Sequence, residues 1–144
     1  MTAFFDTSVL VAAFLEDHPR HDPSLDVYSR FGQCEACCAA HSLAEVYATL
    51  TAMPGRWRLA THEVMLVLRE VREHLTLVAL EPPEYIQVLE DCAGRALASG
   101  AVYDALLGAC ALKAGAETVY TWDVGDFQRL GPQIASRVRT PLQA

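Results

Sequence analysis

Lysine is almost absent from this sequence, and basic residues are few. The 144 residues contain ten arginines and a single lysine, Lys113, against 18 acidic residues, so the formal net charge is -7. This balance argues against a protein that coats nucleic acid nonspecifically or binds membranes through a basic patch. The positive charge that remains is guanidinium, which pairs with carboxylates and phosphates through two parallel hydrogen bonds.

Long hydrophobic runs are also missing. No stretch reaches the roughly 18 consecutive apolar residues of a membrane-spanning helix, and the start, MTAFFDTSV, has neither the basic segment nor the long apolar segment of a secretory signal. We therefore expect a soluble, cytoplasmic protein that makes no membrane contact. Its 52% hydrophobic and 20% charged residues exclude a disordered chain, and its length predicts one domain, residues 1–144.

The five cysteines are an odd number in a chain long enough to fold without disulfides, so we expect reduced thiols. Cys34, Cys37, Cys38 and His41 lie close together in the sequence and raise the hypothesis of a zinc site. Such sites usually need a second, distant ligand pair, and the run EACCAA is more typical of a buried strand of small residues. We favour the strand.

Strand patterns alternate with helix patterns along the whole chain. Short apolar runs predict strands at 2–5, about 35–39, 75–80, 117–123 and 137–140. Helical spacing begins after Asp6-Thr7-Ser8 and recurs at 24–31, 42–53, 61–74, 82–97 and 101–115, with a loop at 18–23 and a short turn or helix at 123–130. The pattern predicts a single-domain α/β fold with three α/β/α layers and a mostly parallel central sheet.

Four acidic residues stand at the ends of these elements. Asp6 ends the first strand, Glu45 lies early in the helix after the second, Asp104 interrupts an apolar helix and Asp123 follows the fourth strand. Taken singly, Asp6 could be a helix cap, Glu45 a solvated glutamate and Asp123 a turn residue. Function gathers at the carboxyl ends of parallel strands, so these positions form the candidate site.

Asp104 is the hardest of the four to explain as a structural residue. Its helical neighbours are small or apolar, and Lys113, the only lysine, lies two and a half turns away. A buried carboxylate is costly unless it is paired, hydrogen-bonded or bound to a metal. If the four acids meet, an all-oxygen site of this kind favours Mg²⁺, with Mn²⁺ as a substitute, and Mg²⁺ activates water for phosphate chemistry.

Four segments resemble the successive acidic motifs of the PIN domain family, and more closely its VapC-type toxins. They are FFDTSVLVAAF, SLAEVYATL, YDALLGACAL and VYTWDVGDF, in family order from Phe4 to the strand before Pro141. The resemblance implies a compact PIN-like α/β/α fold and a metal-dependent endoribonuclease that cleaves RNA phosphodiester bonds. It also implies a cognate antitoxin protein and a homodimer.

The resemblance also assigns roles to particular residues. Asp6 and Asp104 match the main Mg²⁺ ligands, Glu45 the glutamate that completes the site, and Asp123 the fourth acidic position. Asp126 is a candidate for a fifth acidic position. Thr7 and Thr121 match hydroxyl positions that hydrogen-bond the site's carboxylates or waters.

Arg56-Trp57-Arg58, between two helices, combines charge and ring in a form that suits RNA contact. Guanidinium groups bind phosphates and an indole stacks on bases. A packing plug or a dimer contact explains the tripeptide about equally well.

Three alternatives compete with a ribonuclease. A haloacid-dehalogenase-type phosphatase needs a second aspartate two residues after the first, where this chain has Ser8. A response-regulator receiver needs acids before Asp6, where this chain has Phe4-Phe5. The third is a catalytically silent PIN-like module that binds RNA or protein, against which the intact acidic set argues.

Overall fold

The computed structural model describes all residues, 1–144, and contains one five-stranded sheet in which every strand pair is parallel. The strand order is β3-β2-β1-β4-β5, which places β1 at the centre. The strands are β1 (Ala3–Phe5), β2 (Ala36–Ala39), β3 (Thr76–Val78), β4 (Thr118–Tyr120) and β5 (Val138–Arg139). The predicted α/β class is therefore confirmed, and the sheet is entirely parallel.

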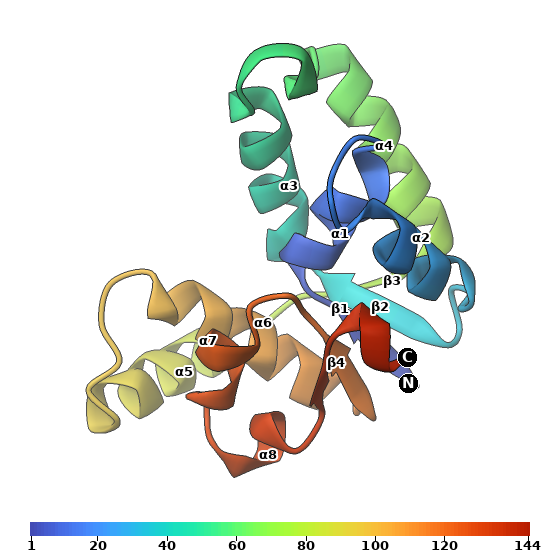
Figure 1. Cartoon of the computed structure of the whole chain (residues 1–144). Helices are drawn as coiled ribbons and strands as arrows, with labels where there is room; N and C mark the ends of the chain where they lie inside the picture. The colour runs from blue at the N-terminus through green and yellow to red at the C-terminus, as the bar shows by residue number, and fades with distance from the viewer.

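Helices cover both faces of this sheet (Figure 1). One layer contains α1 (Thr7–Phe14), α2 (His21–Ser29), α3 (Ala40–Ala52) and α4 (Thr61–His74), with the 3-10 turn η1 (Gly55–Trp57) joining the last two. The other layer contains α5 (Pro82–Gly94), α6 (Ala101–Lys113), α7 (Val124–Gln128) and α8 (Pro132–Ala135); η2 (Pro141–Gln143) ends the chain. No helix combines the length and the apolar character needed to cross a membrane.

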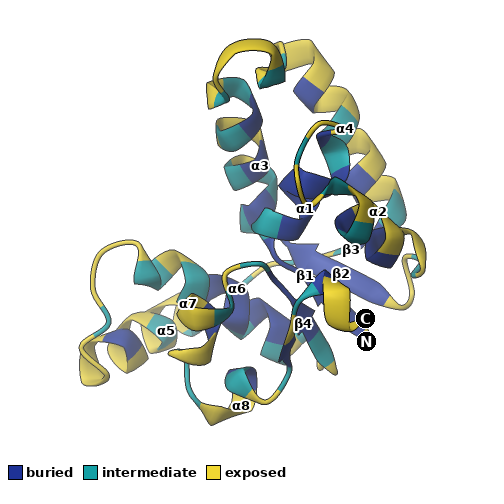
Figure 2. Ribbon diagram, viewed as in Figure 1, coloured by how far each residue is buried: buried dark blue, intermediate teal, exposed yellow.

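Alternation along the strands divides the core in two. In β1, Phe5 packs into the cluster beneath α1 to α4, whereas Phe4 packs into the cluster beneath α6 to α8. Cys38 and Cys37 alternate in the same way on β2. Because successive side chains of a strand point to opposite faces, a run of small apolar residues can serve both layers. Figure 2 shows these strands as the most buried part of the molecule.

Several element boundaries differ from those predicted. Helix α2 begins at His21, inside the predicted loop, because Pro23 is tolerated in the first turn of a helix. Strand β3 is shorter than predicted and only half-buried, since it is an edge strand. Helix α5 ends at Gly94, ahead of Ala96, which has a φ of 53°. The one-turn α8 begins at Pro132, where the sequence patterns predict no helix.

The topology places β1 where the chain changes direction across the sheet. From β1 the chain proceeds outward to β2 and β3, and then crosses to β4 and β5 on the other side. The backbone N–H of Asp6 donates to the carbonyl of Tyr120 at 3.0 Å, which fixes the ends of β1 and β4 side by side. Ligand sites of open parallel sheets lie at such switch points, beyond the carboxyl ends of the strands.

Candidate active site

Asp6 links the end of β1 to the start of α1. It is the N-cap of α1 and is only 3% exposed. Its Oδ2 atom accepts hydrogen bonds from the hydroxyls of Ser8 and Thr121, both at 2.7 Å, and from the Ser8 backbone N–H at 3.4 Å. No protein donor reaches Oδ1. One carboxylate oxygen is therefore anchored, and the other is available to a ligand.

Thr121 and Ser8 extend this anchor into β4 and α7. The Thr121 hydroxyl, fully buried, accepts from the backbone N–H of Asp123 at 2.9 Å, and the Ser8 hydroxyl accepts from the N–H of Trp122 at 3.0 Å. Each hydroxyl thus donates to Asp6 and accepts from the segment after β4. These bonds hold Asp123 beside Asp6.

Glu45 reaches the site from α3, whose first turn directly follows β2. The hydroxyl of Thr7 donates to its Oε1 at 3.0 Å, which joins α1 to α3. Both residues are half-buried. This hydrogen bond fixes the orientation of a carboxylate that would otherwise rotate freely on its helix.

Asp104 lies in the first turn of α6, half-buried and without any hydrogen bond or ion pair. Burial raises the pKa of Asp104 from its ordinary value of 3.8 to about 7. The negative charges of Asp6, Asp126, Asp123 and Glu45 reinforce this rise. The sheet therefore brings all the predicted acids within electrostatic range of Asp104.

The two remaining acids lie at the solvent side. The pKa of Asp123 is raised, mainly because its carboxylate is desolvated and to a lesser extent because of the charge of Asp126. The positive charge of Arg20 lowers the pKa of Asp123 and partly opposes this rise. Asp126 forms an ion pair with Arg129 at 2.8 Å, on the surface of α7. Burial likewise raises the pKa of Asp6 to about 6, against the hydrogen bonds that favour its charged form. The whole group, which we name the carboxylate site, comprises Asp6, Glu45, Asp104, Asp123 and Asp126.

The donor chemistry of the carboxylate site fits a hard divalent cation. All its ligating atoms are carboxylate oxygens, and no arginine or lysine is bonded to Asp6, Glu45, Asp104 or Asp123. No three His, Cys, Asp or Glu side chains stand close enough together to form a finished metal cage. A bound cation would have to draw these carboxylates closer together, and it would offset the repulsion among them.

The cysteines form no comparable site. Cys37 and Cys38 are buried on opposite faces of β2, Cys34 is exposed, and all five cysteines are free. Burial raises the pKa of the Cys37 thiol to about 11 and that of Cys38 to about 12. The zinc hypothesis therefore fails, because the alternation of the strand separates the thiols and burial keeps them protonated.

The tripeptide Arg56-Trp57-Arg58 lies on η1 and contacts neighbouring loops. Arg56 faces Asp17 at 3.7 Å, the Trp57 ring lies 6.0 Å from that of His18, and Arg58 donates to a backbone carbonyl at the end of α3. The structure thus brings the tripeptide to the connection between α1 and α2 rather than to the carboxylates.

Residues 3–131 match the sequence model of the PIN domain. The chain belongs to the PIN domain family. Its relatives include Ribonuclease VapC40 of Mycobacterium tuberculosis, 33% identical over 112 residues that span 78% of this chain and 80% of the relative. Ribonuclease VapC27 of the same organism is 33% identical over 113 residues, 78% of either chain. Within the PIN domain family, this chain is therefore of the VapC type.

Solved structures share the PIN fold. The crystal structure of Mycobacterium tuberculosis VapC20, described as a toxin that cleaves the sarcin-ricin loop, superimposes with a TM-score of 0.69 at 17% identity, over 87% of this chain and 92% of that one. FitAcB from Neisseria gonorrhoeae gives 0.68 at 18% identity, over 99% and 100%. VapBC2 from Rickettsia felis, bound to a promoter DNA fragment, gives 0.65 at 16% identity, over 97% and 98%. At these identities the likeness concerns the fold.

Sequence reasoning missed two polar residues beside the carboxylates of this PIN domain. The sequence predicts Ser8 only as part of a helix start. In the structure its hydroxyl donates to Asp6 and accepts from the backbone N–H of Trp122, which follows β4. The guanidinium of Arg20 lies over the Trp122 ring, with its Cζ atom 4.6 Å from the ring centroid, and its charge lowers the pKa of Asp123. The cap-rich run Asp6-Thr7-Ser8 is the only sequence signal for Ser8, and Arg20 has none.

Proposed function

We propose that this protein is a Mg²⁺-dependent endoribonuclease and the toxin of a toxin–antitoxin pair. The observation that carries the proposal is Asp104, which is half-buried, unpaired and within electrostatic range of the other four acids. Such a site requires a cation, and an all-carboxylate site favours Mg²⁺, with Mn²⁺ as a substitute. The kinship with proteins named as VapC ribonucleases supports RNA as the substrate.

Asp6, Glu45, Asp104 and Asp123 would hold the metal ion, with Asp126 as a further candidate. When bound, Mg²⁺ would neutralise phosphate charge and lower the pKa of a water molecule that hydrolyses the phosphodiester bond. The chain's own hydroxyls set the geometry. Ser8 and Thr121 anchor Oδ2 of Asp6 and leave Oδ1 free, while Thr7 orients Glu45.

An antitoxin protein is the partner that this function requires, since an unopposed ribonuclease would degrade the RNA of its own cell. The structural neighbours VapBC2 and FitAB support it, because their names are those of two-component complexes. We further propose a homodimer. Apolar side chains on the outer face of α5, such as Ile86 at 55% exposure and Leu89 at 47%, support a subunit contact.

The decisive experiment is cleavage of RNA by the purified protein with Mg²⁺. We expect EDTA to abolish cleavage, and Asp6→Ala or Asp104→Asn to reduce its rate by about a hundredfold or more, because each removes a metal ligand. Asp22→Asn, which alters an exposed acid on α2 outside the site, is the matched control and should cleave normally. Activity that survives both EDTA and Asp6→Ala would refute the proposal.

The silent module makes a different prediction in the same assay. RNA binding by wild type and Asp104→Asn alike, without cleavage by either, would favour a PIN-like binding protein. The complete set of acids speaks against that outcome, because binding alone does not need four uncompensated carboxylates.

A further inference from the structure

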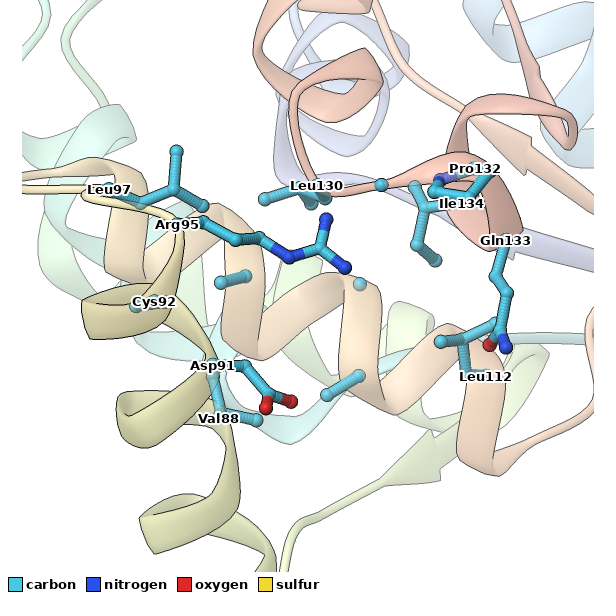
Figure 3. A pocket seen from close by; sticks show the side chains of 14 residues that line it. Val88, Asp91, Cys92, Arg95, Leu97, Leu112, Leu130, Pro132, Gln133 and Ile134 are labelled. Carbon is cyan, nitrogen blue, oxygen red and sulfur yellow. The ribbon is translucent and has the colours of Figure 1, made fainter.

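Two adjoining hollows lie beside the carboxylate site. The first, of about 400 Å³, is lined by Asp104 and Asp126 together with Leu97 and Leu130. The second, of about 320 Å³, shares Leu97 and Leu130 as walls and continues along α6. Figure 3 shows the second hollow, with α6 as its floor and the Arg95 side chain extending across it. The second hollow, which we name the Arg95 pocket, is therefore the direct neighbour of the hollow that Asp104 lines.

Arg95 stands out among the chain's cations. Five of them form ion pairs, namely Arg30, Arg56, Arg69, Lys113 and Arg129. Three more donate to backbone carbonyls, namely Arg58, Arg137 and Arg139, while Arg20 lies over a tryptophan ring. Only Arg72 and Arg95 have no such partner. Arg72 is on α4, in the helix layer of the opposite face of the sheet.

The absence of a side chain at Gly131 gives the Arg95 guanidinium its position. The guanidinium lies against the backbone of Gly131, where a Cβ atom would stand 2.2 Å from Nη1, and Gly131 has a φ of 108° that favours glycine. The backbone thus leaves room for the guanidinium, whose hydrogen-bond donors remain free. Asp91, on the neighbouring turn of α5, also lines the pocket, but it accepts a hydrogen bond from Gln87 and forms no ion pair with Arg95.

We propose that the Arg95 pocket binds a nucleotide of single-stranded RNA next to the phosphate cleaved at the carboxylate site. This inference rests on the proposed function. The free guanidinium takes a backbone phosphate, the apolar walls take the base, and the Asp91 carboxylate accepts from base N–H groups. In a chain of net charge -7, a cation beside the acidic site also offsets the repulsion of the RNA backbone.

The shared walls of the two hollows and the charge of Arg95 indicate which ligand binds in the Arg95 pocket. The pocket shares Leu97 and Leu130 with the hollow lined by Asp104, so a ligand of this pocket lies close to the carboxylate site. A single strand of RNA supplies both a phosphate for the carboxylate site and a second phosphate for Arg95. The volume of the Arg95 pocket lies within the range of small-ligand pockets, about 300 Å³ and above, and this size suits one base.

The test uses Arg95→Gln, with Arg72→Gln as the matched control that removes the other unpartnered cation. In the Asp6→Asn background, binding of a labelled mixed-sequence single-stranded RNA is followed by fluorescence anisotropy at several salt concentrations. We expect Arg95→Gln to weaken binding about tenfold and to reduce the salt slope by about 0.7, the share of one phosphate contact. Arg72→Gln should leave both unchanged.

A second variant fills the pocket without altering charge. Ala109 lines it from α6, and Ala109→Phe should raise the KM for RNA cleavage with little change in kcat, as should Arg95→Gln. Wild-type binding by both variants would overturn the pocket proposal alone, provided that wild type cleaves RNA. A wild-type protein that neither binds nor cleaves RNA would overturn the pocket and the proposed function together.

Discussion

The two oxygens of Asp6 have different surroundings, and the difference defines the role of its neighbours. Oδ2 accepts three hydrogen bonds from Ser8 and Thr121, whereas Oδ1 accepts none. These bonds stabilise the charged carboxylate and partly offset the cost of its burial, so its pKa rises only to about 6. Under the proposed function, Ser8 and Thr121 are therefore positioning residues, which act on the proposed metal ligand Asp6 through hydrogen bonds.

Thr121→Val tests this role. Because the variant removes a donor to the ionised form, the pKa of Asp6 should rise further, and the acidic limb of the pH–rate profile should move to higher pH. The same displacement is expected in the pH dependence of Mg²⁺ binding, measured by calorimetry. Thr51→Val, which removes an exposed hydroxyl bonded within α3, is the control. An unchanged or lower midpoint would contradict the role.

At this scale, sequence patterns can identify the acids but not all their partners. Asp6, Asp104 and Asp123 follow from their positions at the ends of strands or within an apolar helix, because charged groups there need an explanation. Ser8 does not follow, since the groups that use its hydroxyl include a backbone N–H 114 positions away. Only the pairing of β1 with β4 brings them together.

Among the elements, the long periodic helices were the most predictable. Helix α4 has the predicted bounds, because Val64, Leu68 and Val71 form a regular buried stripe that ends where β3 begins. The short elements depend on their surroundings. Helix α8 has four residues and is held by Ile134 in the core, and no periodicity can reveal a helix of a single turn.

The turn η1 allows a test at the scale of elements. Trp57 is half-buried against His18 and helps to hold the α3–α4 connection to that between α1 and α2. Trp57→Ala should lower the free energy of unfolding by about 1–2 kcal/mol, measured by urea denaturation. RNA affinity measured on the same variant tests the predicted RNA contact separately. An unchanged unfolding midpoint would show that the ring contributes no packing.

For the whole molecule, the carboxylate site makes stability depend on pH. Without metal, Asp6 and Asp104 retain their protons up to about pH 6 and 7, whereas ordinary aspartates ionise near 3.8. The folded protein then binds more protons than the unfolded chain across this window. The contribution of these two carboxyl groups to the free energy of unfolding therefore falls as the pH rises from about 4 to 7.

Asp104→Asn removes part of this effect. In EDTA, the variant should exceed wild type in free energy of unfolding by about 1 kcal/mol above neutral pH, after allowance for the partial exposure of Asp104, and by much less near pH 4. Urea titrations at both pH values measure it, with Asp22→Asn as control. Mg²⁺ should stabilise wild type more than the variant. A variant less stable than wild type only at the higher pH would contradict the energetic cost that burial and the neighbouring charges impose on ionised Asp104.

The hydrogen bond from Thr121 to Asp6 spans 115 positions of the chain, and β1 meets β4 only when residues 118–120 are present. During synthesis from the N-terminus, most of the chain must therefore leave the ribosome before Asp6 can accept its hydrogen bond from Thr121. A partly translated chain has no assembled site. Assembly of the carboxylate site therefore waits for the synthesis of β4, near the end of the polypeptide.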